Sequence, residues 1–271
     1  MTQHLLMVDD DAGMRATFSD LLFTGTGIEV LAAASGEEAI PLLHKRPGVI
    51  LADYRLGSGM NGVEFLQRAR DELPLTTRYL FTDNLGASID DMTSRDETVG
   101  EEGLALLAME KATIASPDYF HETIRDGFAR YDRLAASRIM VVDDEASFLR
   151  VIRRRFATKG YNLEMHDKPG DAIAYLQGYT QNPERETRPL AVLLTDTNMP
   201  GWNGAEVARA AKAADRNIRV VMMTGERSLN RTLYAQLEQD IDPFPILEKP
   251  FDFTDACALI GREIVRYHAS R

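Results

Sequence analysis

The chain of 271 residues is long enough for two domains of ordinary size. Hydrophobic residues make up 44% and charged residues 27%, a balance that excludes a disordered or fibrous protein. A net charge of −11 disfavours binding to nucleic acid or to anionic membranes. The single cysteine, Cys257, excludes an internal disulfide, and no apolar segment reaches the roughly 18 residues that a membrane span needs. We therefore expect a soluble, cytoplasmic protein.

Short apolar runs alternate with amphipathic segments through the first part of the chain. Such runs predict buried strands, and we expect them at 5–8, 28–32, 49–53, 79–82 and 104–109. Helical patterns lie between them at 14–22, 35–43 and 62–70, and Ser35 is the expected N-cap of the second helix. The polar segment 84–103 predicts a loose or short helix.

Strands that alternate with helices indicate βαβ units, a parallel sheet, and helices on both of its faces. The fold class is therefore α/β. After residue 117 an apolar stripe predicts one longer helix that closes the first domain and leads to the second. The stripe consists of Phe120, Ile124, Phe128, Tyr131 and Leu134.

The second half of the chain repeats the first in chemistry and in order. Four kinds of position recur at offsets of 134 to 143 residues: the paired acids Asp9–Asp10 and Asp143–Asp144, the strand-end acids Asp53 and Asp196, the hydroxyls Thr82 and Thr224, and the lysines Lys111 and Lys249. Four unlike positions at nearly one offset indicate a duplication. The change in offset places an insertion at 179–189, which we expect to be a polar surface loop.

The acids of each half follow strands of the predicted sheet. The carboxyl end of a parallel sheet is where open α/β folds bind ligands. Like charges gathered there repel one another unless a cation neutralises them, so each half predicts a candidate metal site.

In these positions each half resembles the receiver domain of two-component response regulators. The second half carries the fuller set: Asp143-Asp144, the run from Asp196 to Gly204, Thr224-Gly225, and Lys249-Pro250-Phe251. The resemblance implies two flavodoxin-like (βα)5 domains, each with a five-stranded parallel sheet of order 2-1-3-4-5. We expect receiver domains at 1–116 and 138–271, joined by a last helix and linker at 117–137. We find no signature of an output domain in these residues.

The same resemblance implies a role for each position in the second half. Asp196 accepts a phosphoryl group from a histidine kinase or a histidine phosphotransfer protein. Asp144, Asp196 and the carbonyl of Asn198 hold Mg²⁺, and Asp143 holds a metal-bound water. Lys249 and Thr224 contact the phosphoryl oxygens. The signal then passes to a downstream protein target, or through a homodimer, and the chain is not a turnover enzyme.

The first half departs from the family pattern. Its corresponding residues are Asp9, Asp10, Asp53 and Arg55 around the metal, with Thr82 and Lys111 at the phosphoryl group. However, Ala112 stands in place of the usual proline, the loop after Asp53 is one residue longer, and Asp83 follows Thr82. A carboxylate about 5 Å from the phosphoryl group would cost roughly 3 kcal/mol at an effective dielectric of 20. We therefore expect Asp53 to accept phosphate more slowly than Asp196.

Several alternatives remain open at this point. The chain could act as a phosphorylation-controlled adaptor, as a phosphate sink or relay, or as a scaffold independent of phosphate. An aspartate-nucleophile phosphatase of the dehalogenase kind is disfavoured because Arg55 and Asn198 stand where it needs a second acid. Ala108 and Ile246 occupy the family's switch-aromatic position. His121 is expected to be a solvated helix residue and not a phosphotransfer histidine.

Overall fold

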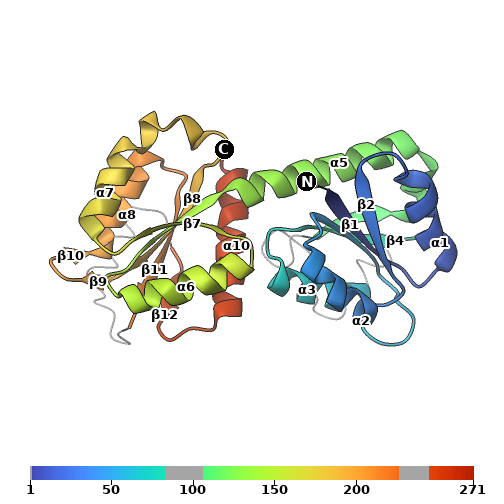
Figure 1. Cartoon of the computed structure of the whole chain (residues 1–271), viewed down its shortest axis with the longest axis horizontal. Coiled ribbons are helices and arrows are strands. Elements are labelled where there is room, and N and C mark those ends of the chain that lie inside the picture. The colour runs from blue at the N-terminus through green and yellow to red at the C-terminus, as the bar shows by residue number, and fades with distance from the viewer. Residues whose placement is uncertain (1, 84–105, 226–243) are drawn as a thin grey trace. The chain divides into compact units, whose positions relative to one another are not determined.

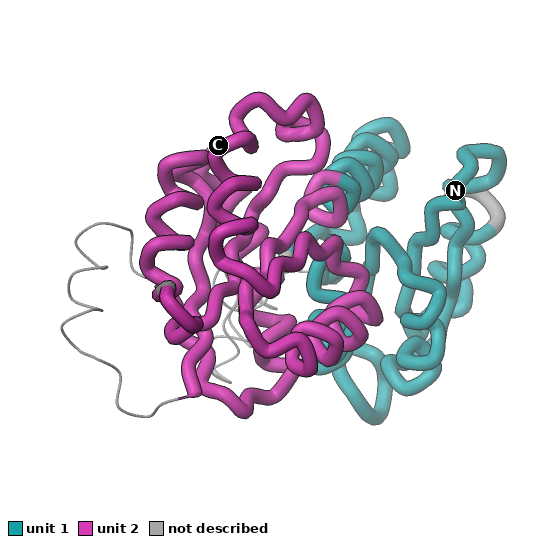
Figure 2. The backbone as a smooth tube through the Cα atoms, turned by 60° about the vertical axis from the view of Figure 1, so that its left-hand side comes forward, with its two compact units in different colours: residues 1–132 teal, residues 133–271 magenta. Residues whose placement is uncertain are grey.

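The computed structural model describes residues 2–83, 106–225 and 244–271. The chain divides into two compact units, unit 1 with residues 1–132 and unit 2 with residues 133–271 (Figure 2). The division falls inside helix α5 (Pro117–Ala136), which is the predicted closing helix. The helix expected at 84–103 lies outside the described residues.

Unit 1 is built on a parallel sheet of order β2-β1-β3-β4-β5, as the sequence predicted. Its strands are β1 (Gln3–Val8), β2 (Ile28–Ala33), β3 (Val49–Asp53), β4 (Thr77–Thr82) and β5 (Leu106–Glu110). Every residue of β3 and β4 is buried, because helices cover both faces of the sheet. This burial explains the apolar run of β3 up to Asp53 and the apolar centre of β4, Tyr79 to Phe81.

The helices of unit 1 enclose two cores, one on each face of the sheet. On one face α2 (Gly36–Ala39) and α3 (Gly62–Glu72) pack over Leu6, Ile50 and Leu80. The other face is covered by α1 (Ala12–Ala16), the π-helical turn that extends it (Thr17–Leu22) and α5. The helix expected over 14–22 is present, and its second half, Thr17–Leu22, is π-helical. Ser35 caps α2 as predicted, since its hydroxyl accepts from Glu38 N at 3.2 Å.

Unit 2 repeats this plan, with the order β7-β6-β8-β11-β12 and all strands parallel. Its strands are β6 (Arg138–Val142), β7 (Asn162–His166), β8 (Leu190–Asp196), β11 (Arg219–Thr224) and β12 (Ile246–Glu248). Its helices are α6 (Ala146–Thr158), α7 (Pro169–Gly178), α8 (Gly204–Ala214) and α10 (Phe253–Ala269) (Figure 1). Two parallel five-stranded sheets therefore confirm the predicted fold class.

Two local predictions hold only in part. Residues 180–188 are exposed or half-buried, as expected of a surface segment. The insertion at 179–189 is not simply a surface loop, because Tyr179 is 1% exposed and its hydroxyl accepts from Leu190 N at 2.7 Å. Tyr179, the one aromatic residue of this polar segment, is thus part of the core. His121 is not freely solvated, because its Nε2 lies 2.6 Å from Leu22 O and its ring lies 5.5 Å from that of Phe23.

Candidate functional sites

Both units place their acids by the same backbone contacts. Asp9 follows β1, and its N–H donates to Ala33 O at 3.1 Å. Asp143 follows β6, and its N–H donates to His166 O at 3.2 Å. The first acid of each pair is therefore held at the carboxyl end of the sheet by the neighbouring strand.

A glycine holds each strand-end acid close to the helix that follows it. A Cβ added at Gly62 would lie 2.0 Å from Asp53 O, and one added at Gly204 would lie 2.2 Å from Asp196 O. Both distances are far inside van der Waals contact, so only glycine fits. An asparagine precedes each glycine and closes a capping box with a glutamate. The helix α3 or α8 is thus anchored directly behind the acid.

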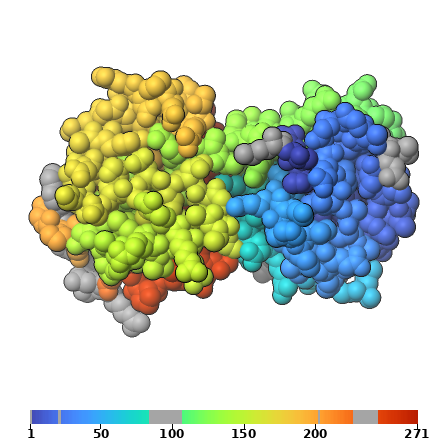
Figure 3. Space-filling model, viewed as in Figure 1, coloured from blue at the N-terminus to red at the C-terminus, as the bar shows by residue number. Residues whose placement is uncertain are grey.

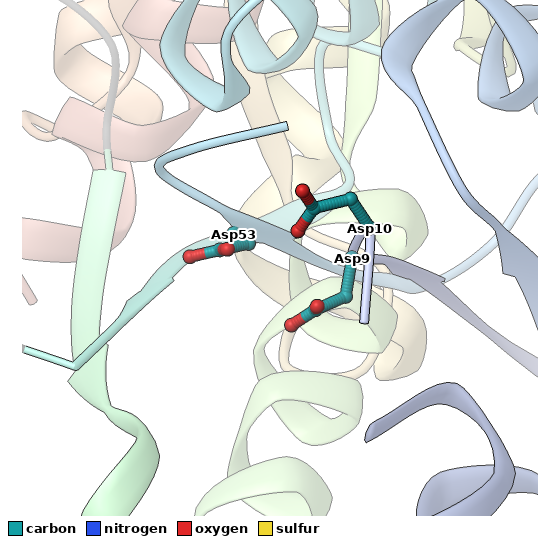
Figure 4. A group of neighbouring side chains, drawn as sticks. All are labelled: Asp9, Asp10 and Asp53. Atoms are coloured by element: carbon teal, nitrogen blue, oxygen red, sulfur yellow. The ribbon is translucent and has the colours of Figure 1, made fainter. Parts of the chain in front are cut away.

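In unit 1 the three predicted acids form one cluster. Asp9, Asp10 and Asp53 each offer a carboxylate oxygen, and these oxygens lie within 4.8 Å of one another (Figure 4). Lys111 Nζ lies 2.9 Å from Asp9 Oδ2 and 3.1 Å from Asp53 Oδ2. Three carboxylates at this spacing are the oxygen donors that Mg²⁺ prefers, so the residues fit the ion that the family implies.

The charges of this cluster perturb one another. Burial raises the pKa of Asp53 to about 6; Lys111 opposes the rise, and the charges of Asp9 and Asp10 add to it. Burial alone would lower the pKa of Lys111, but its contacts with Asp9 and Asp53 outweigh burial and raise that pKa. The lysine therefore carries its charge at neutral pH.

In unit 2 the lysine makes the closer contacts. Lys249 Nζ lies 2.6 Å from Asp143 Oδ2 and 2.6 Å from Asp196 Oδ1. Burial raises the pKa of Asp143, against the contact with Lys249. Asp144 is exposed, and within the described ranges the three-acid grouping occurs around Asp53 and not here. This difference between the two halves is not predictable from the sequence, because both carry the same paired acids.

The remaining predicted residues also lie around the two sites. Thr82 and Thr224 end β4 and β11 and are buried, and Lys249 N donates to Thr224 O at 2.6 Å. Asn198 N donates to Asp196 Oδ2 at 3.0 Å. Arg55 and Asn198 are both exposed. The Lys249–Pro250 peptide bond is cis.

One contact of the second site was not predicted. Lys249 Nζ lies 4.4 Å from the ring centroid of Phe148, within the range of a cation–π interaction. Phe251 packs edge-on against the same ring at 5.9 Å. Phe148 follows Asp144 by four residues, about one helical turn. That spacing could have identified Phe148 as a neighbour of the site. Unit 1 has Met14 at the corresponding position.

The expected obstruction by Asp83 is smaller than the sequence suggested. Asp83 Oδ2 lies 4.0 Å from Lys111 Nζ, but its side chain is 85% exposed. Water screens an exposed charge, so an effective dielectric of 20 is too low for it. The estimate of about 3 kcal/mol is therefore too large.

Comparison with known proteins identifies the family. The family described as "Response regulator receiver domain" matches residues 5–93 and 139–260, which is more than half of the chain. The chain belongs to the response regulator receiver family. Both receiver matches fall on the units described above, one on each.

The receiver relatives among known proteins align with about half of the chain. The DNA-binding transcriptional regulator NtrC of Salmonella typhimurium is 30% identical over 48% of this chain, and the chain spans 25% of that relative's length. The response regulator receiver protein CpdR of Brucella abortus is 26% identical over 47% of this chain and 97% of its own. A putative two-component system response regulator/GGDEF domain protein aligns over 98% of this chain at 16% identity, with a TM-score of 0.47. Among the described residues, no helix is long and apolar enough to cross a membrane.

Proposed function

We propose that this protein is a response regulator whose Asp196 accepts a phosphoryl group from the phosphohistidine of a histidine kinase or phosphotransfer protein. Asp53 is a second and slower acceptor. The observation that carries the proposal is the position of Lys249, whose Nζ contacts both Asp143 and Asp196 at 2.6 Å. A cation held at the acceptor carboxylate attracts the anionic phosphoryl group to the atom that must attack it.

The transfer uses residues of this chain in defined roles. A carboxylate oxygen of Asp196 attacks phosphorus, the bond from phosphorus to the donor's imidazole nitrogen breaks, and the imidazole leaves with its electron pair. Lys249 moves from the carboxylates to the transferred phosphoryl oxygens, and the Thr224 hydroxyl donates to one of them. Asp143, Asp144, Asp196 and the carbonyl of Asn198 are the residues that would hold Mg²⁺, which would supply positive charge for the approach of the anionic donor.

The product is an acyl phosphate, and no substrate is turned over. The chain therefore acts through its phosphorylated state, by binding or releasing a protein partner, and is not an enzyme in the usual sense. Ile246, at the switch-aromatic position, is 36% exposed and aliphatic. We propose that movement of Thr224 toward the phosphoryl group, and not rotation of an aromatic ring, carries the change.

The surface of unit 2 favours an acidic partner. Helix α6, lime-green in Figure 3, carries the exposed residues Arg150, Arg153 and Arg154, although the whole chain has a net charge of −11. Val151 lies among them and is 44% exposed. A basic helix face with an apolar centre matches an acidic protein surface. Phosphotransfer to Asp196 should accordingly slow as salt rises from about 0.05 to about 0.5 M, a range in which the Debye length falls through about 10 Å. A rate independent of salt over this range would contradict this docking mode.

Intact-mass measurement tests the proposal. The wild-type protein and the Asp53→Ala and Asp196→Ala variants are each incubated with acetyl phosphate, with Mg²⁺ or with EDTA. We expect the mass of one phosphoryl group to appear with Mg²⁺, faster in Asp53→Ala than in Asp196→Ala. No labelling of any variant, or labelling independent of Mg²⁺, would reject the proposal and favour a scaffold independent of phosphate.

The lifetime of the label separates the adaptor from the sink. Once the donor is removed, slow loss of phosphate from Asp196 supports an adaptor that holds its signal. Fast loss supports a phosphate sink or relay. Glu226 stands at a position that influences this hydrolysis, but it lies outside the described residues.

A further inference from the structure

The loop between β3 and α3 in unit 1 is fastened to helix α2. Glu37, in the first turn of α2, accepts a hydrogen bond from Met60 N at 3.0 Å through its Oε1. The same oxygen would lie 3.0 Å from a Cβ at Gly59, whose φ is +128°. The Met60 side chain packs on Gly36, 3.0 to 3.3 Å from where a Cβ would stand. The exposed carboxylate of Glu37 therefore holds the outer side of the loop.

The same loop reaches the acid cluster at its other end. A Cβ at Gly57, which has a φ of +67°, would lie 3.6 Å from Asp10 Oδ2. Leu56 is 3% exposed and packs in the same core cluster as Tyr54, so its burial also anchors the loop to unit 1. The loop thus connects Glu37 on its outer side with Asp10 on its inner side.

Unit 2 does not share this arrangement within its described residues. Its loop is one residue shorter and folds into a small hairpin of β9 (Asn198–Met199) and β10 (Trp202–Asn203). A Cβ at Gly201, the positive-φ glycine of this hairpin, would meet nothing within 4 Å. Asp10 and Asp144 are both exposed, but only in unit 1 does a positive-φ glycine of the loop, Gly57, lie beside the second acid of the pair among the described residues.

We propose that Glu37 is a positioning residue for the divalent-cation site of unit 1. By holding Met60 and Gly59, it keeps the loop against Asp10 and keeps that carboxylate beside Asp9 and Asp53. This inference rests on the proposed function, because it takes the acid cluster as the cation site. Glu37 itself contacts no ion, and the loop transmits its effect to the ligands.

Manganese binding to the full chain tests the role of Glu37. Asp143→Ala/Asp144→Ala is the reference protein, because it leaves unit 1 as the intact site. Free Mn²⁺ is measured by electron paramagnetic resonance during titration. We expect Glu37→Ala to weaken the Kd of the reference protein by roughly threefold to tenfold, which is less than loss of a direct partner of a metal ligand. Glu37→Gln keeps an acceptor for Met60 N and should retain the reference Kd.

Glu38→Ala is the matched control. Glu38 lies in the same turn of α2 and has the same charge, but its Oε2 accepts from Ala34 N at 2.9 Å, on the side away from the loop. A general weakening of α2 would change the Kd equally in both alanine variants, and that result would overturn the inference. Hydrogen exchange in EDTA provides a second readout, in which amides 56–61 should exchange faster in Glu37→Ala alone.

The outcomes separate this inference from the proposed function. A reference protein that binds no Mn²⁺ would overturn the proposed metal site and the inference together. A reference protein that binds Mn²⁺ with the same Kd as Glu37→Ala would overturn the inference and leave the metal site standing. A selective loss in Glu37→Ala, restored in Glu37→Gln, supports both.

Discussion

Removing the charge of Asp83 should quicken phosphorylation of Asp53. Asp83 Oδ2 lies 4.0 Å from Lys111 Nζ, and Asp53 Oδ2 lies 3.1 Å from the same nitrogen. The negative charge of Asp83 therefore offsets part of the positive charge that Lys111 presents at Asp53. Two unit charges 4 Å apart interact by about 1 kcal/mol in water, and the 85% exposure of Asp83 justifies that dielectric. Since about 1.4 kcal/mol is a factor of ten, Asp83→Asn should raise the rate by up to about fivefold.

The assay follows intact mass over time with acetyl phosphate and Mg²⁺, in an Asp196→Ala background that leaves Asp53 as the acceptor. Asp118→Asn, an exposed acid in the first turn of α5, is the control for a change of net charge alone. The gain should shrink in about 1 M salt, where the Debye length is about 3 Å. An unchanged or slower rate in Asp83→Asn would refute the electrostatic reasoning.

Three further predictions follow from the described contacts. Phe148→Leu should slow labelling of Asp196 about fivefold, because a cation–π contact contributes about 1 kcal/mol; an unchanged mass time course would show that this ring does not hold the site lysine. Asp53→Asn should stabilise metal-free protein against urea at pH 7.5 by about 1 kcal/mol, since a buried like charge is removed. The pKa of Asp53 is raised to about 6, so the wild type regains stability as pH falls through 6; a gain that persists at pH 4 would contradict this cause. Gly204→Ala should destabilise unit 2 by about 3 kcal/mol or more, whereas Gly178→Ala, with nothing within 4 Å of its Cβ, should stabilise it by about 0.5 kcal/mol; equal urea midpoints would contradict the close approach.

Much of the fold could be predicted because it depends on short-range patterns. Strands buried on both faces appear as apolar runs, so the sequence predicts β3 at its observed bounds. The meeting of acids and lysine at one sheet edge was also predictable, because parallel strands end together. Lys111 and Lys249 do contact their acids in the structure.

The remaining features of the fold and of the sites depend on contacts that no local sequence pattern indicates. Tyr179 is buried at the start of a polar segment, and its neighbours in the sequence do not indicate that burial. The contact of Glu37 with Met60 spans 23 residues and requires a glycine at 59 with a positive φ. The closer grouping of acids in unit 1 is likewise not predictable from residue identity, since both halves carry the same paired acids.

The glycine behind each strand-end acid makes the position of the following helix independent of the length of the loop before it. Gly62 N and Gly204 N each donate, at 3.1 Å, to the carbonyl oxygen of the residue that follows the acceptor, so each loop leaves and returns at the same two points. An extra residue between those points lengthens the loop without displacing the strand or the helix. The two loops therefore span the same two anchor points, and exchanging them between the units should leave each strand-end acid in its place.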